Sequence, residues 1–332
     1  MSDLVIATDA GLYCPAGDFH IDPHHKVSRA VITHAHADHA RPGMGHYWAT
    51  QSSAGLMRLR VGRDAPMTLL SYGERITLGG ATVSLHPAGH VLGSAQVRIE
   101  VDGAVWVVSG DYKRCADPSC EPFQPVRCDT FITEATFALP LYHWDAPGVV
   151  AQQIFDWWQQ CKADGKAAVL FCYALGKAQR VLAELMPFFD ADALARGELE
   201  PVLLHGAMTP LVAVYRKAGI RMLPTEALGT PPKGSVFAGR LILAPPGARG
   251  TPWMRRFAPC STGFASGWMR VSGNRRSQAY DRGFTLSDHS DWPGLIRTIE
   301  ETGARRVLAM HGDSETLIAH LRAKGIAAAA LA

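Results

Sequence analysis

The chain has 332 residues, of which 47% are hydrophobic, and its formal net charge is only +3. This length suggests about two domains, and the apolar content is ample for a large core. The small net charge excludes a protein that binds nucleic acid through a uniformly basic surface, so any such surface must be a local patch. No run of about 18 apolar residues occurs, and the N-terminal residues do not resemble a signal peptide. We therefore expect a cytoplasmic protein without a membrane-spanning helix.

The sequence contains seven cysteines, an odd number, without a CxxC pair. Cys115, Cys120 and Cys128 lie close together, but their spacing is not that of a zinc ribbon. This pattern favours reduced thiols, with a structural metal site as the alternative.

The N-terminal residues 4–7 are predicted to form a short strand that ends at a turn, Thr8-Asp9-Ala10-Gly11. Asp9 fits the ordinary role of an aspartate in a turn. After a loop, the apolar residues 27–32 predict a second strand. A helix is expected at about 52–61.

The second strand leads directly into residues 33–39, a segment that contains three histidines and one aspartate. His34 and His36 are two positions apart, so their side chains project from the same side, while Asp38 and His39 can reach a second metal nearby. Imidazole nitrogen and carboxylate oxygen are ligands that suit zinc and similar divalent ions. The alternative is a histidine-rich surface tract, but a tag would lie at a terminus without a strand before it. We therefore predict a metal site here.

Short strands that end at a histidine or an acidic residue recur along the chain. Strands are predicted at 81–85, 105–108, 130–133, 283–287 and 306–310, and they lead to His90, Asp111, Glu134, His289 and His311, respectively. This repetition is expected of a site built along one edge of a sheet.

Between Glu134 and residue 283, predicted helices alternate with predicted strands. The helices are expected at 148–163, 177–188 and 209–218, and the strands at 167–171, 202–204 and 241–243. This alternation predicts a parallel α/β unit. The unit has no G-x-G-x-x-G segment, so we do not expect a dinucleotide site. Two further helices, at 292–302 and 314–324, follow in the C-terminal part.

Residues 249–282 are strongly basic, with seven arginines and a single acidic residue, Asp281. Guanidinium groups bind phosphates well, and aromatic rings can stack on unpaired bases. The alternative is a solvated basic face over core aromatic residues. The nucleic-acid-binding candidates are Arg249, Arg255, Arg256, Arg270, Arg275, Arg276 and Trp268; Arg282, Trp253, Phe257, Phe264 and Tyr280 lie among them.

The segment His34-x-His36-x-Asp38-His39 resembles the signature of the metallo-β-lactamase superfamily, whose fold is a four-layer αββα sandwich with a dinuclear metal site. The region after Glu134 resembles the cap domain of the β-CASP nucleases, the branch of that superfamily that cuts DNA and RNA. The resemblance implies an α/β protein in which residues 1–138 and 284–332 form the metallo-β-lactamase sandwich. Residues 139–283 would form the inserted β-CASP α/β cap.

The resemblance also implies a role for each candidate residue. Two divalent metal ions are expected, zinc or alternatively manganese or magnesium. His34, His36 and His90 would hold the first ion, Asp38, His39 and His311 the second, and Asp111 would bridge them. Asp9 would brace the metal-binding loop through hydrogen bonds. Glu134 would polarise His289, which we expect to protonate the leaving group.

Three segments, at 8–14, 33–43 and 110–114, resemble the bacterial ligase-associated DNA exonucleases, which are usually encoded beside an ATP-dependent DNA ligase and a large helicase. This implies a DNA exonuclease in repair that acts on a single strand or a duplex end in the bacterial nucleoid. An RNA-processing β-CASP ribonuclease is the first alternative. A small-molecule hydrolase would not need the cap or the arginines, and a non-catalytic nucleic-acid-binding scaffold would lack metal ligands.

Overall fold

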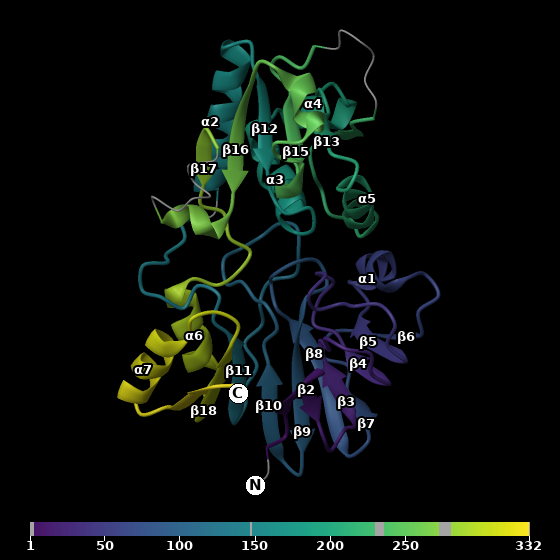
Figure 1. Ribbon diagram of the computed structural model, residues 1–332, viewed down its shortest axis with the longest axis vertical. Coiled ribbons are helices and arrows are strands. Elements are labelled where there is room, and N and C mark those ends of the chain that lie inside the picture. The colour runs from purple at the N-terminus through teal and green to yellow at the C-terminus, as the bar shows by residue number, and fades with distance from the viewer. Residues whose placement is uncertain (1–2, 147, 230–235, 272–279, 332) are drawn as a thin grey trace. The chain divides into compact units, whose positions relative to one another are not determined.

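The computed structural model of the chain describes residues 3–146, 148–229, 236–271 and 280–331 (Figure 1). The chain divides into two compact units. The first, here called the sandwich unit, comprises Met1–Cys115, Cys120–His143 and His289–Ala332. The second, here called the inserted unit, comprises Ala116–Ser119 and Trp144–Asp288. Among the described residues, no helix is both long enough and apolar enough to cross a bilayer.

The sandwich unit contains two sheets, and the first is formed by the N-terminal residues. Its strand order is β1-β2-β3-β4-β5-β6. The strands are β1 Ile6–Thr8, β2 Gly11–Cys14, β3 Phe19–Ile21, β4 Arg29–Val31, β5 His46–Thr50 and β6 Met67–Leu70. The predicted helix at 52–61 is confirmed as α1, Ala54–Val61, which packs against β5.

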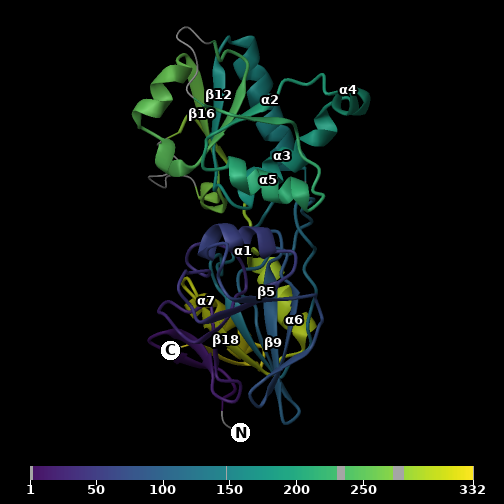
Figure 2. The same ribbon diagram turned by 90° about the vertical axis from the view of Figure 1, so that its right-hand side faces the viewer.

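The second sheet of the sandwich unit has the order β19-β18-β11-β10-β9-β8-β7. Its strands are β7 Ile76–Leu78, β8 Ala81–Pro87, β9 Ala95–Val101, β10 Ala104–Val108, β11 Thr130–Glu134, β18 Arg306–Met310 and β19 Ala327–Ala330. β10, β11, β18 and β19 run parallel to one another. Two helices, α6 Trp292–Thr302 and α7 Glu315–Ala323, lie beside β18 (Figure 2).

Apolar side chains fill both faces of the second sheet because alternate residues of a strand point to opposite sides. Val83 and Ile99 belong to a core that also contains Val31 of the first sheet. On the other face, Phe131 and Val307 pack in a core whose helical members are Leu295, Ile299, Leu317 and Leu321. The helices α6 and α7, the second sheet and the first sheet therefore form successive layers. This arrangement confirms the predicted α/β sandwich.

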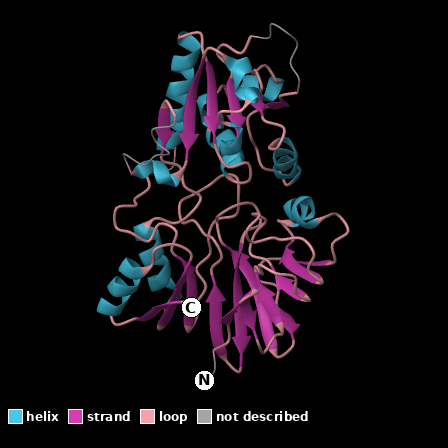
Figure 3. Cartoon of the chain, in the orientation of Figure 1, coloured by secondary structure: helices cyan, strands magenta, loops and turns pink. Residues whose placement is uncertain are grey.

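The inserted unit contains one six-stranded parallel sheet with the order β14-β13-β15-β12-β16-β17. Its strands are β12 Ala167–Phe171, β13 Val202–Leu204, β14 Thr225–Ala227, β15 Leu241–Ala244, β16 Cys260–Ala265 and β17 Arg282–Phe284. Its α-helices are α2 Val149–Ala163, α3 Lys177–Glu184, α4 Ala191–Arg196 and α5 Thr209–Lys217. Its 3₁₀ helices are η1 Met186–Phe188, η2 Pro246–Ala248, η3 Pro252–Phe257 and η4 Gly267–Arg270. The alternation of helices and strands (Figure 3) confirms the predicted parallel α/β unit.

One predicted strand belongs to a different sheet from the one expected. We predicted that residues 283–287 return to the sandwich, but β17 pairs in parallel with β16 in the inserted unit. Phe284 is buried there, with its ring centroid 5.4 Å from that of Trp157. The prediction is therefore wrong, because the apolar contacts of Phe284 are made in the core of the inserted unit. The chain leaves the inserted unit only after Asp288.

Candidate metal centre

The candidate site lies where several strands of the second sheet of the sandwich unit end. Asp111 follows β10, Glu134 is the last residue of β11, and His311 follows β18. These three strands are parallel neighbours, so their carboxyl ends share one edge of the sheet. His34 follows β4 of the other sheet. The sheet edge therefore collects side chains that are far apart in the sequence, from His34 to His311.

Three histidines and one aspartate form a tight group at this edge. His36 Nδ1 lies 3.0 Å from His34 Nε2 and 3.1 Å from His90 Nε2. Asp111 Oδ2 lies 3.7 Å from both of those Nε2 atoms. For zinc with bonds of about 2.1 Å, ligand atoms in a tetrahedron are about 3.4 Å apart. The donor atoms therefore have the type that zinc binds, and these four distances lie close to the tetrahedral value, while all ligand atoms of the group lie within 4.8 Å of one another.

A chain of hydrogen bonds favours one tautomer of His34. The Thr33 hydroxyl donates to Asp22 Oδ2 at 2.6 Å, so its oxygen can accept from His34 Nδ1, which lies 3.0 Å away. A proton on Nδ1 leaves Nε2 unprotonated and facing His36 and Asp111. Such outer partners commonly orient the histidine ligands of a metal.

Asp22 also holds His39, the nearest member of the predicted second metal site. His39 Nδ1 lies 2.7 Å from Asp22 Oδ2. Its other nitrogen, Nε2, lies 3.5 Å from Asp111 Oδ2 and 3.8 Å from Asp38 Oδ2. His39 therefore faces the bridging candidate Asp111 with the nitrogen that Asp22 leaves free.

The remaining candidates for the second metal are more open. The side chain of Asp38 is 77% exposed, and the ring centroid of His311 lies 5.9 Å from that of His39. Together with His39 they line a cavity of about 240 Å³. All seven predicted ligands thus gather at one edge, but the tight four-residue group is that of the predicted first metal.

Burial and neighbouring charges hold His34 and Asp111 in the forms that bind metal, a neutral imidazole and a carboxylate, whereas His39 must lose a proton before it can act as a ligand. Burial holds the pKa of His34 well below its usual range, so this ring is neutral. Burial would raise the pKa of Asp111, but the adjacent His39 and His289 outweigh it and hold that pKa well below its usual range. For His39, burial lowers the pKa, but Asp111 and Asp22 outweigh it and raise the pKa well above its usual range.

His289 and Glu134 form a second arrangement next to Asp111. His289 Nδ1 lies 2.8 Å from Glu134 Oε2 and 4.0 Å from Asp111 Oδ2. Glu134 is buried, and its oxygens accept hydrogen bonds from Tyr112 N at 2.7 Å and Thr136 Oγ1 at 2.5 Å. Because Glu134 is fixed at both oxygens, it orients the imidazole of His289, whose side chain is 23% exposed.

The bracing role predicted for Asp9 is filled by another residue. Asp9 is exposed in the turn between β1 and β2, whereas Asp22 makes the hydrogen bonds to Thr33 and His39. Asp22 follows the short strand β3, so it carries the same strand-end signal as the predicted ligands. The bracing role therefore passes from Asp9 to Asp22, because the hydrogen bonds that hold Thr33 and His39 come from the carboxylate of Asp22.

The arginine-rich segment is only partly described, since Arg275 and Arg276 lie outside the described residues. Arg249 and Arg255 are exposed; the Arg249 guanidinium lies 4.8 Å from the ring centroid of Tyr280. Arg256 donates to the Gly229 carbonyl at 3.2 Å, Arg270 lies 3.9 Å from Asp145, and Trp268 is half-buried. Phe257 and Phe264 are core residues of the inserted unit, so base stacking is the wrong interpretation for these two rings.

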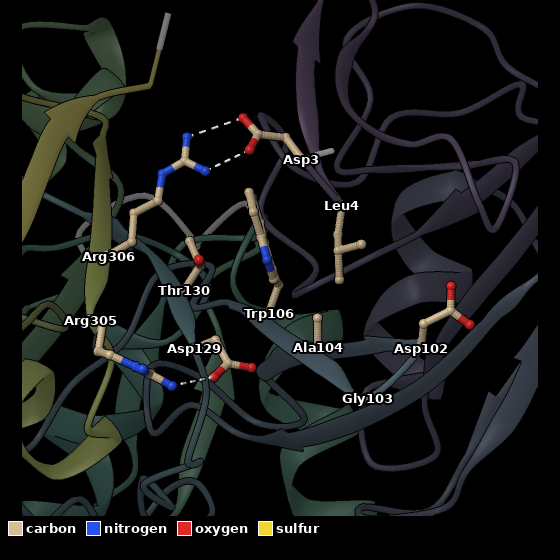
Figure 4. Close-up of a pocket in the computed structure, with 10 residues that line it drawn as sticks. All are labelled: Asp3, Leu4, Asp102, Gly103, Ala104, Trp106, Asp129, Thr130, Arg305 and Arg306. Carbon is tan, nitrogen blue, oxygen red and sulfur yellow. Dashed lines mark hydrogen bonds and ion pairs between the residues drawn. The ribbon is translucent and has the colours of Figure 1, made fainter. Parts of the chain in front are cut away.

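A larger cavity lies at the other ends of the same strands. It has a volume of about 490 Å³ and is lined by residues at the starts of β10, β11 and β18, among them Ala104, Thr130 and Arg306 (Figure 4). Arg306 forms an ion pair with Asp3 at 2.5 Å, and Arg305 lies 3.7 Å from Asp129. Its arginines are thus matched by acidic residues of the cavity itself, and none of the predicted site residues lines it.

The chain is similar in sequence to several known proteins, although no family model matches it. It is 31% identical over 323 residues to a probable DNA ligase of Opitutus terrae, an alignment that covers 97% of this chain and 30% of the relative. It is 23% identical to an RNase J-like protein of Methanocaldococcus jannaschii, over 63% of this chain and 55% of that relative. It is 26% identical to ribonuclease TTHA0252 of Thermus thermophilus, over 49% of this chain and 44% of that protein.

The chain therefore spans between about a third and about half of the length of these relatives. Among solved structures, a protein of unknown function from Enterococcus faecalis V583 superposes with a TM-score of 0.56 at 13% sequence identity. That match covers 88% of this chain and 76% of the other, and at this identity it supports the fold alone.

Proposed function

From the family that these relatives indicate, the metallo-β-lactamase superfamily and its β-CASP nucleases, we propose that this chain is a metal-dependent nuclease that hydrolyses phosphodiester bonds. The observation that carries the proposal is the tight group of His34, His36, His90 and Asp111. Beside it stands a histidine, His289, held by a buried carboxylate. Metal ligands next to a possible proton donor are what hydrolysis of a phosphodiester requires.

We propose that the protein binds two divalent ions, with zinc as the first choice and manganese or magnesium as alternatives. The first would be held by His34, His36 and His90, the second by Asp38, His39 and His311, and Asp111 would be shared. When bound, such ions supply a water of lowered pKa as the nucleophile and neutralise charge on the phosphate.

The protein's own residues would supply the remaining steps. His289, held through Nδ1 by Glu134, presents Nε2 as the donor of a proton to the leaving oxygen. Asp22, through Thr33 for His34 and directly for His39, keeps the Nε2 atoms of both rings directed toward Asp111. Exposed arginines of the segment 249–282, among them Arg249 and Arg255, would hold the phosphates of the strand.

We propose DNA as the substrate and exonucleolytic cleavage in DNA repair as the activity. The resemblance of segments 8–14, 33–43 and 110–114 to ligase-associated DNA exonucleases supports this proposal. So does the match of nearly the whole chain to a relative named as a probable DNA ligase. An ATP-dependent DNA ligase, and with it a helicase, would then be the partners. The inserted unit would serve as the β-CASP cap.

RNA cleavage is the second candidate, because other relatives carry the names RNase J-like protein and ribonuclease. The test uses DNA and RNA strands of matched sequence, each labelled at one end and then at the other, with zinc, manganese or magnesium. We expect stepwise shortening of the DNA from one end. Faster cleavage of the RNA would favour the ribonuclease. Binding of both strands without cleavage in the presence of any of the three metals would favour a non-catalytic nucleic-acid-binding scaffold.

A further inference from the structure

The inserted unit contains a buried cluster of charged side chains that the proposed chemistry does not use. Lys177 and Arg180 lie on the first two turns of α3, and their side chains are 3% and 6% exposed. Their acidic partners are Asp117, Glu184 and Asp288, whose side chains are 3%, 8% and 4% exposed. The cluster therefore joins three segments that are far apart in sequence.

Both cations of the cluster hold the segment 287–288. Lys177 Nζ lies 2.5 Å from Asp288 Oδ2. Arg180 Nη1 donates to the Ser287 carbonyl at 2.6 Å and lies 3.6 Å from Asp288 Oδ1. Arg180 is itself fixed, because its Nε lies 2.7 Å from Glu184 Oε1 and 3.8 Å from Asp117 Oδ2. Backbone and side chain of the segment are thus held at the same time.

Stability alone is a weak explanation for this cluster. Burying charges costs desolvation free energy, and apolar side chains of similar volume often stabilise a core as well or better. A buried ion pair also fixes the orientation of the groups that it joins, because ion pairs and hydrogen bonds to a carbonyl form only within a small range of distances and angles. The position that this cluster defines is that of Asp288, the residue directly before His289.

The residue after His289 is held as well. Ser290 N donates to the Tyr112 carbonyl at 2.7 Å, and Tyr112 N in turn donates to Glu134 Oε1 at 2.7 Å. The backbone is therefore anchored at the residues directly before and directly after His289. One anchor, Tyr112, also positions the carboxylate that His289 contacts.

We propose that Lys177 and Arg180 are positioning residues for His289. By fixing the Ser287 carbonyl and the Asp288 carboxylate, they hold the backbone conformation of the two residues that lead into His289, and so limit the orientations of its imidazole. The inference rests on the proposed function, in which His289 is the proton donor. It assigns to a buried cluster of the inserted unit a role in the chemistry of the sandwich unit, transmitted through the peptide bond between Asp288 and His289.

The test removes both members of the ion pair at once, as Lys177→Met with Asp288→Asn, so that no unpaired charge stays buried. The kcat for DNA should fall by about 10²-fold, the effect of misplacing a catalytic group by about 1 Å. KM and metal content should remain unchanged. A crystal structure of the variant should show the distance between His289 Nδ1 and Glu134 Oε2 lengthened beyond its present 2.8 Å. The matched control is Arg98→Met with Glu100→Gln, an ion pair within β9 of the sandwich unit with an N–O distance of 2.8 Å.

A second comparison separates positioning from general support of the fold. In a His289→Ala background, the same double change should cause no further loss of kcat, because the group that it positions is already absent. A further loss of similar size in that background would overturn the proposal. So would a full rate on DNA with the 2.8 Å distance unchanged.

If the double variant does not fold, Arg180→Lys keeps the buried charge but loses the planar group that binds both Ser287 and Glu184. It should show the same fall in kcat and the same lack of effect with His289→Ala. Failure of the proposed function has a different signature, since the wild type would then cleave neither DNA nor RNA. In that case the His289–Glu134 distance in the variant still decides the positioning role.

Discussion

Asp22 accepts two hydrogen bonds from Thr33, one from the backbone N–H at 2.8 Å and one from the hydroxyl at 2.6 Å. The same carboxylate lies 2.7 Å from Nδ1 of His39. One side chain therefore orients His39 directly and His34 through the Thr33 hydroxyl, which lies 3.0 Å from His34 Nδ1. The direction of two candidate ligands is set by the protein before any metal is bound.

The first prediction follows from this arrangement. Asp22→Asn should weaken metal binding by about 10–100-fold, the usual effect of losing an outer partner of a ligand. Competition with a chromophoric chelator measures this change. Asp18→Asn is the matched control, because Asp18 lies in the same N-terminal region but its side chain is 73% exposed. Wild-type affinity in the Asp22 variant would show that the ligands are oriented without it.

The second prediction concerns Asp111, which lies within 3.7 Å of His34, His39 and His90. The purified protein should bind close to two divalent ions, and Asp111→Ala should lose most of this metal because one carboxylate would serve both ions. Elemental analysis of both proteins provides the measurement. Asp313→Ala, which removes an exposed carboxylate near His311, should keep the full content. Unchanged metal in the Asp111 variant would contradict the shared-ligand assignment.

The third prediction concerns the basic segment. Replacing Arg249 and Arg255 with alanine should weaken binding to single-stranded DNA and reduce its salt dependence, because fewer counterions are released. The slope of log K against log salt should fall by about 0.7 for each phosphate that the variant no longer neutralises. Metal content should not change. Titrations at several salt concentrations give the slope. Arg196→Ala is the control, since this exposed arginine pairs with Glu198 away from the segment. An unchanged slope would identify a solvated basic face.

The gathering of candidate residues at one edge could be predicted from a local pattern, a short apolar strand followed by a histidine or an acid, whereas their roles as metal ligands came from the family resemblance. Parallel neighbours such as β10, β11 and β18 then bring Asp111, Glu134 and His311 to one edge. Asp22 carries the same signal after β3, but that strand has only three residues, and Asp22-Pro23 has the composition of a turn. Its function becomes visible only through hydrogen bonds to residues 11 and 17 positions further along.

Long-range partners could not be predicted in this way. A strand pattern at 283–287 does not state which sheet the strand joins, and contacts such as that of Phe284 with Trp157 decide it. Likewise, Lys177 has the composition of an ordinary helix start. Its burial depends on Asp288, which is 111 residues away, and no local pattern connects the two.

The last prediction concerns His289. It lies outside the group of His34, His36 and His90, although with Asp111 and Glu134 it forms a second set of close ligand atoms. Its Nδ1 contacts Glu134 at 2.8 Å, which favours the donor role over that of a ligand. We therefore expect His289→Ala to keep its metal and still bind DNA. Its cleavage rate should fall by about 10²–10⁴-fold, the range typical of losing a general acid. His46→Ala, which removes a histidine of β5 that is hydrogen-bonded to Thr68, should leave the rate unchanged.

Comparing two substrates that differ in their leaving group distinguishes a proton donor from a metal ligand or a structural residue. A nitrophenyl ester has a leaving group that departs without a proton, so its hydrolysis does not need His289, and the variant should lose much less activity on it than on DNA. A ligand or a structural residue would slow both substrates alike, because both need the metal and the fold. Equal losses on the two substrates, or loss of metal from the variant, would therefore show that His289 is not the donor. In that case its contact with Glu134 would serve only to order the segment that follows Asp288.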